Sequence, residues 1–410
     1  GLKAQEEKPF RNALAGGNSE LSDSLVRKLD EHGFFGPPRE AAPDPPSVQL
    51  QLTNDCNLAC SYCCTNSGSP RRGEVTHEQM REVVKQIPSA LGAGTSVALL
   101  GGEPLLVPWT LDLAGEILDL GMRLTIFTNG TPLADDKVAG RVAGLVARGA
   151  QVRVSLGGST RCGCDSLSGA PRYDDALAGI ARLAAHGATA YVDIMVTPGN
   201  ADELATELRG LRARLPVGTK IAIGVLYHSG RETGANLFRS RSDLEAALDR
   251  IAFESGETIP ATQPKPLANR REACTCALGR HVHVRSDGAL FNCFKMEERL
   301  GDLADGFREG ATHIMNNPRR AADTPWCADC PLVTLCGGGC RSENLLYTGD
   351  PDRPPCGPWR VRVLCEMLAG NRPDVVEWPV AFLLAEARSR GIAVPADLKP
   401  RVPSRHLSEA

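Results

Sequence analysis

The feature that most constrains this 410-residue chain is a sixfold alternation of strand-like and helix-like segments. Short apolar or alternating runs, which favour β-strands, begin at Ser47 and recur as far as Leu226. These runs are "SVQLQLT", "TSVALLG", "RLTIFTN", "QVRVSL", "TAYVDIMVT" and "KIAIGVL". Strands that alternate with helices form parallel sheets with right-handed crossovers. The pattern therefore predicts the fold class α/β, as a partial (β/α)6 TIM-like barrel.

The segments between these runs have helical periodicity. Thr76 is placed to cap one of them, and Gln79 is placed to complete a capping box with it. Further helices are predicted over about 109–120, 134–148, 173–186 and 201–214. From about residue 255 the alternation gives way to short pieces that are rich in glycine and cysteine. A second domain is therefore expected after the barrel.

Four regions follow from this organisation. Residues 1–46 combine a helical segment with a proline-rich linker, and residues 47–255 form the barrel. Residues 256–370 form the cysteine-rich domain, and residues 371–410 form a C-terminal helical tail.

Composition excludes several classes of protein. The chain has 46 lysines and arginines against 49 acidic residues, and its basic residues are scattered, which argues against nucleic-acid binding. No apolar run approaches the ~18 to 20 residues that cross a bilayer. The first residues also lack the order of a signal peptide. We therefore expect a cytoplasmic protein that binds neither nucleic acid nor membrane.

The chain has fifteen cysteines. In a reducing compartment disulfides are rare, and clustered thiols usually bind metal. Cys56, Cys60 and Cys63 have the spacing C-x3-C-x2-C in the loop expected after the first strand. Ligands of α/β barrels lie at this end of the strands. A structural zinc site requires four closed ligands, whereas three thiolates on a four-iron cluster leave one iron open. An open iron–sulfur site is therefore predicted.

This motif, with Tyr62 before its last cysteine, resembles the signature of the radical S-adenosylmethionine (SAM) enzymes. The resemblance implies that a [4Fe-4S] cluster on Cys56, Cys60 and Cys63 chelates SAM at its open iron. Cleavage of SAM then gives a 5′-deoxyadenosyl radical, which abstracts a hydrogen atom from a substrate. The alternative is a zinc knuckle that uses Cys64 or a distant residue as its fourth ligand.

Further residues resemble the family's contacts with SAM. The strand "TSVALL" ends in "GGEP", which is similar to the family's site for the amino group of the cofactor. Asn129 in "FTNG" and Ser155 in "VSLGG" fall where the family contacts the sulfonium and ribose regions, although ordinary capping of strand ends is the alternative. The cofactor-binding residues that the resemblance implies are Tyr62, Gly101, Gly102, Glu103, Pro104, Asn129 and Ser155.

The second cysteine-rich region resembles the SPASM domain, an extension with two auxiliary iron–sulfur clusters. Eleven residues separate Cys276 from Gly288, four more lead to Cys293, and "CADCPLVTLCGGGC" follows after a gap. By this resemblance the distal [4Fe-4S] cluster is held by Cys327, Cys330, Cys336 and Cys356. Cys293 and Cys340 help to hold the proximal one, with Cys274 and Cys276 either both bound or only one bound, which would leave an open iron. A zinc ribbon over residues 327–340 is the alternative.

The resemblance implies three clusters in all and a flavodoxin- or ferredoxin-type electron donor. It also implies a ribosomally synthesised precursor peptide as substrate, which would gain a thioether, carbon–carbon or ether crosslink or another oxidative modification. One alternative is a small-molecule dehydrogenase. Another is a sulfatase-type maturase, although Phe294 stands where that group has an aspartate after the cluster cysteine. A zinc-stabilised peptide-binding scaffold is the non-enzymatic alternative.

Four residues are candidates for a catalytic role. Cys162 and Cys164 form "RCGC" in the loop expected after the fourth strand, where they would either act in catalysis or substrate capture, or be ordinary reduced thiols. Asp193 and Glu232 are acids within the barrel segment, and nothing in the sequence selects one of them as the base. Cys365 lies in a helix-like stretch and is expected to be buried packing.

Overall fold

The computed structural model describes most of residues 45–356. The described ranges are 45–227, 229–232, 234–257, 276–328 and 333–356, together with the single residues Asp23, Arg27 and Cys274. Apart from Asp23 and Arg27, the predicted N-terminal segment up to residue 44 lies outside the described residues. So do Cys330, Cys365 and the predicted tail over 371–410.

All six predicted strands are present, and they lie in one sheet. They are β1 (Ser47–Gln51), β2 (Ser96–Leu100), β3 (Arg123–Thr128), β4 (Gln151–Leu156), β5 (Tyr191–Val196) and β6 (Lys220–Val225). Each pairs in parallel with the next strand along the chain. The predicted α/β fold with a parallel sheet is therefore confirmed, and it is consistent with a partial TIM barrel.

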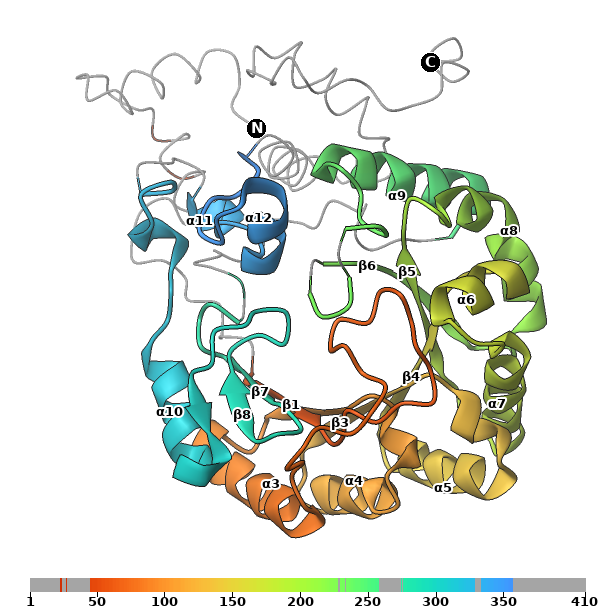
Figure 1. Ribbon diagram of the computed structural model, residues 1–410, viewed down its shortest axis with the longest axis horizontal. Helices are drawn as coiled ribbons and strands as arrows, with labels where there is room; N and C mark the ends of the chain where they lie inside the picture. The colour runs from red at the N-terminus through yellow and green to blue at the C-terminus, as the bar shows by residue number, and fades with distance from the viewer. Residues whose placement is uncertain are drawn as a thin grey trace.

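Helices cover the outer, convex side of this curved sheet, as Figure 1 shows. They are α3 (His77–Leu91), α4 (Thr110–Asp119), α5 (Asp136–Ala147), α7 (Tyr173–Ala185), α8 (Ala201–Arg214) and α9 (Arg241–Ser255). The short helix α6 (Arg161–Ser168) instead contacts the loop after β1, where Ala59 N–H donates to Ser168 O (3.2 Å). The 3-10 turns η1 (Pro104–Leu106) and η2 (Thr131–Ala134) follow β2 and β3. The predicted capping box is confirmed, since Gln79 N–H donates to Thr76 Oγ1 and Thr76 N–H donates to Gln79 Oε1. Among the described residues, every helix falls short of the length and hydrophobicity that a membrane span needs.

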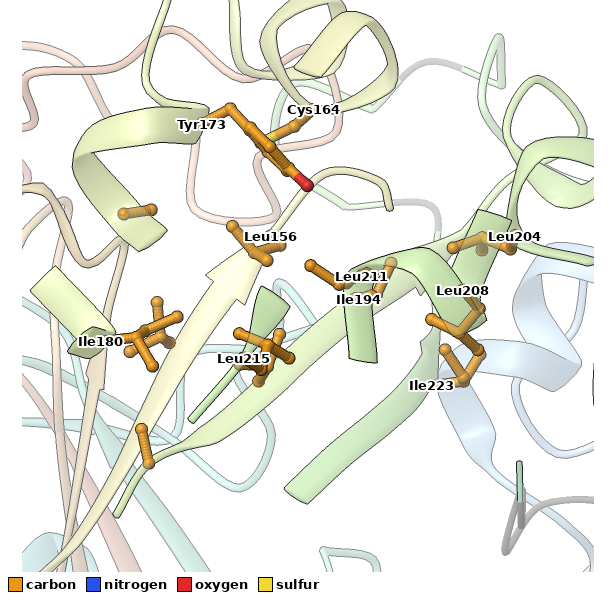
Figure 2. Packing of buried hydrophobic residues seen from close by; sticks show 14 of the residues in the cluster. Leu156, Cys164, Tyr173, Ile180, Ile194, Leu204, Leu208, Leu211, Leu215 and Ile223 are labelled. Carbon is orange, nitrogen blue, oxygen red and sulfur yellow. The ribbon is translucent and has the colours of Figure 1, made fainter. Parts of the chain in front are cut away.

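The core lies between the sheet and these helices. On β4, Val152, Val154 and Leu156 belong to one buried cluster with Ile180 and Leu183 of α7. Figure 2 shows part of this cluster, which continues onto β5 and α8. Burying each such side chain contributes about 1.5–3 kcal/mol relative to leaving it in water. Because successive strand residues alternate in direction, the residues between them on β4 face the concave side.

The sheet does not end with the barrel strands. β7 (His281–Val284) pairs in parallel with β1, and β8 (Ala289–Phe291) and β9 (Gly301–Asp302) extend the sheet beyond it in antiparallel order. The described residues of the cysteine-rich region therefore begin as a continuation of the barrel sheet. The remaining elements are η3 (Leu303–Asp305), α10 (Phe307–Asn316), η4 (Ala321–Asp323), α11 (Val333–Cys336) and α12 (Arg341–Thr348).

Candidate functional site

The cysteine loop, residues 52–75, joins β1 to α3 on the concave side of the sheet (Figure 1). Its start is bonded to the segment after β2, because Gly102 N–H donates to Thr53 O (2.8 Å) and Glu103 N–H donates to Asp55 O (2.9 Å). A Cβ atom on Gly102 would lie 2.0 Å from the Asp55 oxygen, so only glycine permits this approach. Gly102 therefore allows the segment after β2 to lie against the backbone of the cysteine loop at Asp55.

The three spaced thiols of this loop have different environments. Burial raises the pKa of Cys56 to about 11, and burial also raises the pKa of Cys60. Burial acts against ionisation of Cys63 as well, but hydrogen bonds from Thr65 and Ser67 outweigh it and lower the pKa of this thiol. Ser67 N–H lies 3.2 Å from Cys63 Sγ, and the Thr65 hydroxyl lies 3.4 Å from it.

The surroundings of Cys63 favour the thiolate form that the ligands of an iron–sulfur cluster take, whereas burial alone favours the protonated form of Cys56 and Cys60. Donors aimed at sulfur stabilise a thiolate, and bonds of this kind tune such clusters. The charges of Cys60 and Cys63 also act on one another and on Cys56, so the three sulfurs lie in one neighbourhood. Three thiols on one loop at the carboxyl end of β1 are therefore a suitable donor set for a cluster.

A buried arginine that the sequence analysis missed adds positive charge here. Arg172, which precedes α7, is only 2% exposed. Its Nη1 donates to Asn129 O (2.8 Å) and to Ser155 O (2.7 Å), and its charge opposes the rise in the pKa of Cys60. Arginine before a helix is usually a surface residue, so the sequence held no signal for this role.

A second missed arginine lies in the loop after β6. Arg231 Nη1 donates to Cys60 O (2.7 Å), its Nη2 donates to Ser67 O, and its backbone N–H donates to Cys63 O (2.8 Å). Gly230 has a φ of +65°, and a Cβ atom there would lie 2.4 Å from Cys63 O. The loop after β6, the strand at one edge of the sheet, therefore binds the backbone of the cysteine loop.

Glu103 lies at the carboxyl end of β2, as the sequence predicted, and is fully buried. Its carboxylate accepts hydrogen bonds from Thr128 Oγ1 (2.8 Å), Asn129 N–H (2.6 Å) and Leu105 N–H (3.0 Å). Burial raises the pKa of Glu103 to about 7, although these bonds act in the opposite direction. The side chain therefore ties the ends of β2 and β3 together beneath the cysteine loop.

The other residues expected to contact SAM lie around the same loop. Asn129 Nδ2 donates to Asn57 Oδ1 (2.8 Å), which connects the end of β3 to the cysteine loop. Tyr62 is half-buried between Cys60 and Cys63. Ser155 lies at the end of β4 and is linked to this group through Arg172. Their assignment to SAM stays a prediction.

The structure also brings together the thiols predicted for the proximal cluster. The Cys276 thiol donates a hydrogen bond to the sulfur of Cys293, which raises the pKa of Cys276 and lowers that of Cys293 to about 6. Negative charge on Cys274 or Cys340 acts in turn on Cys276. Cys340 is the N-cap of α12, and burial raises the pKa of its thiol. All four thiols are therefore neighbours, including both members of "CTC".

The thiols predicted for the distal cluster are described only in part. Cys327 is buried, Cys336 and Cys356 are half-buried, and Cys330 lies outside the described residues. The run "CGGGC" has positive φ at all three glycines, with values of 63°, 69° and 73°. Non-glycine residues rarely adopt three such conformations in succession, so this turn requires the sequence that it has.

Of the catalytic candidates, Cys162 and Cys164 lie on α6 rather than in a loop. Cys164 is fully buried in the core beside Tyr173, as Figure 2 shows, whereas Cys162 is exposed. The helix is capped by Thr160, whose hydroxyl donates to Glu203 Oε2 (2.8 Å). Core packing therefore accounts for Cys164.

Asp193 and Glu232 both have partners. Asp193 on β5 forms a two-pronged ion pair with Arg153 of β4, with distances of 2.7 and 2.5 Å. Glu232 accepts hydrogen bonds from Gly234 N–H (2.7 Å) and from the side chain of Asn236 (2.6 Å). Both carboxylates are therefore bonded to partners within the protein. Neither is singled out as the catalytic base.

Comparison with known proteins agrees with this geometry. Residues 50–209 match the model of the radical SAM superfamily. A PqqA peptide cyclase of Xanthomonas oryzae pv. oryzae is 28% identical over 337 residues, covering 75% of this chain and 86% of the relative. The mycofactocin maturase MftC of Mycobacterium tuberculosis is 26% identical over 342 residues, covering 75% of this chain and 81% of the relative.

Solved structures share the fold. The enzyme anSMEcpe with bound AdoMet has a TM-score of 0.59 at 17% identity, covering 84% of this chain and 99% of that one. SuiB of Streptococcus suis, bound to the precursor peptide SuiA, has a TM-score of 0.53 at 15% identity, covering 85% of this chain and 86% of that one. Residues 50–209 are therefore similar to the radical SAM superfamily, and PqqA peptide cyclases and mycofactocin maturases resemble the chain over about three quarters of its length.

Proposed function

We propose that this chain is a radical SAM peptide maturase. The observation that carries the proposal is the group of three thiols, Cys56, Cys60 and Cys63, on one loop at the carboxyl end of β1. With a four-iron cluster and SAM bound there, the site supplies reductive cleavage of SAM, which starts hydrogen abstraction from a substrate.

The chain's own residues prepare this site. Arg172 brings a buried positive charge to Cys60, and Thr65 and Ser67 direct hydrogen bonds to Cys63. Glu103 fixes the ends of β2 and β3, where the GGEP segment and Asn129 would hold SAM. Arg231, in the loop after β6, holds the cysteine loop in place through hydrogen bonds to the backbone oxygens of Cys60 and Cys63.

We further propose two auxiliary clusters in a SPASM domain over residues 256–370. The proximity of Cys274, Cys276, Cys293 and Cys340 supports a proximal cluster with four thiolate ligands and no open iron. The distal cluster would use Cys327, Cys330, Cys336 and Cys356. A fully ligated cluster exchanges electrons and does not bind substrate, so the proximal cluster would accept an electron from the substrate.

A ribosomally synthesised precursor peptide is the proposed substrate. The names of the relatives support it, since PqqA peptide cyclase acts on a peptide, and SuiB is seen with the peptide SuiA. The product would be a crosslink or another oxidised residue. A flavodoxin- or ferredoxin-type donor and a cytoplasmic location belong to the same proposal, because the clusters need reducing conditions.

Release of 5′-deoxyadenosine from SAM under dithionite tests the enzyme class. The anaerobically reconstituted chain should release it, and Cys60→Ala should abolish release because a cluster ligand is lost. Cys162→Ser, which changes an exposed thiol on α6, is the matched control and should retain release. Equal release of 5′-deoxyadenosine by Cys60→Ala and the parent chain would refute the proposal.

The substrate is tested with a synthetic peptide encoded beside the gene. A maturase should lower the mass of this peptide by that of a pair of hydrogen atoms, only when SAM and reductant are present. Oxidation of a small alcohol, with no change in the peptide, would favour the dehydrogenase alternative.

A further inference from the structure

The concave face of the sheet carries a row of alternating aromatic and basic side chains. Phe127 of β3 pairs in register with Arg153 of β4, which pairs in turn with Tyr191 of β5. Tyr191 pairs with Lys220 of β6. Residues next to them along the strands, such as Val152, are buried in the core on the helix side, so the four side chains point to the concave side. These four residues are called the inner row, and their strands curve around the concave side in Figure 1.

Aromatic rings hold the two cations of the inner row. The guanidinium carbon of Arg153 lies 5.6 Å from the centre of the Phe127 ring and 5.4 Å from that of the Tyr191 ring. Lys220 Nζ lies 5.1 Å from the centre of the Tyr191 ring and donates to its hydroxyl oxygen (3.2 Å). The quadrupole of a ring attracts a cation without cancelling its charge. The rings therefore hold both positive charges on the concave face and leave them positive.

Asp193 fixes the orientation of one of these cations. Its carboxylate accepts hydrogen bonds from Arg153 Nε (2.7 Å) and Nη2 (2.5 Å), and its side chain is only 6% exposed. In the described part of the chain these bonds leave Nη1 of Arg153 without a partner, and the arginine side chain is 28% exposed. A guanidinium has five N–H donors in one plane and can bind a second anion at its free edge. Arg153 is therefore oriented to receive an anion from the concave side.

Positive charge exceeds negative charge on this face. The charged residues of strands β2 to β6 are Arg123, Arg153, Asp193 and Lys220, and all four stand at concave-facing positions. Asp193 balances Arg153, whereas Arg123 and Lys220 form no ion pair with any residue that the structure describes. A ligand that lies on this face should therefore carry negative charge.

We propose that the inner row binds a carboxylate of the precursor peptide, from an aspartate or glutamate side chain or from the C-terminus. This inference rests on the proposed function, because it requires a peptide on the concave side, where the radical would form. Carboxylates are the anions that an unmodified peptide carries. The bound carboxylate would accept a hydrogen bond from Arg153 Nη1 and would be attracted by Lys220, and the neighbouring rings would contact the apolar part of the same peptide residue.

The depth of the inner row gives this contact a consequence for the reaction. Arg153 stands two residues before Ser155, so the inner row lies about 7 Å further into the barrel than the end of β4. A peptide residue anchored at this depth fixes which of its neighbours meets the radical at the strand ends. The inner row would therefore set the position of the modified residue along the peptide.

Binding of a fluorescently labelled synthetic peptide tests the proposal. The reconstituted full chain with SAM is titrated against the precursor peptide encoded beside the gene, and anisotropy gives the Kd. Lys220→Glu, which reverses a charge at an exposed position, should raise the Kd at least tenfold. Lys137→Glu makes the same change at an exposed position of α5, on the outer side of the sheet, and should leave the Kd unchanged.

Changes in the peptide identify the source of the carboxylate. Each acidic residue of the peptide is replaced by its amide, one at a time, and a further peptide has an amidated C-terminus. One of these peptides should bind the parent chain at least tenfold more weakly and should bind the parent chain and Lys220→Glu with similar Kd. Equal binding of every neutralised peptide to the parent chain would overturn the proposal.

Reversal of charge on both sides separates direct contact from a structural role. A peptide with lysine in place of the identified acidic residue, or with a C-terminal lysine amide where the terminus is identified, should bind Lys220→Glu more tightly than the parent chain. The double variant Arg153→Gln with Asp193→Asn removes both charges of the ion pair and should also weaken binding of the unchanged peptide.

Two outcomes distinguish failure of this inference from failure of the proposed function. A parent chain that releases no 5′-deoxyadenosine from SAM, or that binds no precursor peptide, would refute the proposed function. A parent chain that modifies the peptide but binds it with the same Kd as Lys220→Glu would overturn the role of the inner row alone.

Discussion

The protonation of Glu103 depends strongly on its surroundings. It is a carboxyl group at the end of a strand, fully buried and bonded to Thr128, Asn129 and Leu105. Burial disfavours the charged form, whereas bonds from N–H and O–H groups favour it. Because burial dominates, the pKa rises to about 7. A group balanced in this way should make stability depend on pH.

The sign of this dependence can be predicted. The folded-state pKa of about 7 lies above the ordinary 4.5, so the folded chain retains a proton in this range that the unfolded chain has released. The stability contributed by this proton is complete below about pH 4.5 and is lost as pH rises through about 7. The full effect is about 3 kcal/mol. Urea denaturation should show this decline in the parent chain and a flatter profile in Glu103→Gln.

Equal pH profiles for the two chains would contradict the account of Glu103. Glutamine keeps the size of the side chain and cannot titrate, so the comparison isolates the proton. A lower stability of Glu103→Gln at every pH is expected as well, because one amide group would face the N–H of Asn129.

Residues at the site differed in how well the sequence revealed them. The spacing of Cys56, Cys60 and Cys63 was sufficient to predict one loop at a strand end, because consecutive thiols cannot lie far apart. Arg172 and Arg231 could not be predicted, because their contacts join residues that are distant in the sequence. Cys164 was expected in a loop and lies on α6, a two-turn helix that Thr160 caps by accepting from Gly163 N–H.

Among the elements, the loop after β6 holds the cysteine loop through direct backbone contacts. Ser229 Oγ donates to Cys64 O (2.8 Å), and Gly230 packs directly against the backbone of the cysteine loop. The two loops come from β1 and β6, which lie far apart in the strand order. Contact between them therefore closes the carboxyl end of the partial barrel.

Gly230→Ala should break this contact. The substitution adds a left-handed conformation for alanine and a clash 2.4 Å from Cys63 O. Gly73→Ala is the matched control, because Gly73 has a similar φ of +75° and no atom within 4 Å of the added Cβ. Both variants share the backbone strain of about 1–3 kcal/mol, and only Gly230→Ala adds the clash. Urea denaturation should find Gly230→Ala the less stable of the two. Equal stability would argue against a close contact between the loop after β6 and the cysteine loop.

The strands show both the reach and the limit of prediction from sequence. Apolar residues at every second position were sufficient to place all six barrel strands, as on β4. The pairing of β7 with β1 was not predicted, because Ser47 and His281 are separated by most of the chain. Such pairing depends on tertiary packing, here of Val282 and Val284 in the same core as Val48 and Leu50.

At the scale of the whole molecule, one sheet carries two groups of thiols. The cysteine loop follows β1. Of the proposed proximal thiols, Cys274 and Cys276 precede β7, Cys293 follows β8 and Cys340 caps α12. Because β7 pairs with β1, the two groups are attached to neighbouring strands.

The central claim is that this chain holds three iron–sulfur clusters. The most direct measurement is the iron, sulfide and zinc content of the anaerobically purified and reconstituted chain. The account predicts about twelve irons and about twelve sulfides per chain, falling by about four of each when Cys56, Cys60 and Cys63 are all changed to alanine. One or two zinc ions with no iron would contradict it and would favour a zinc-stabilised scaffold.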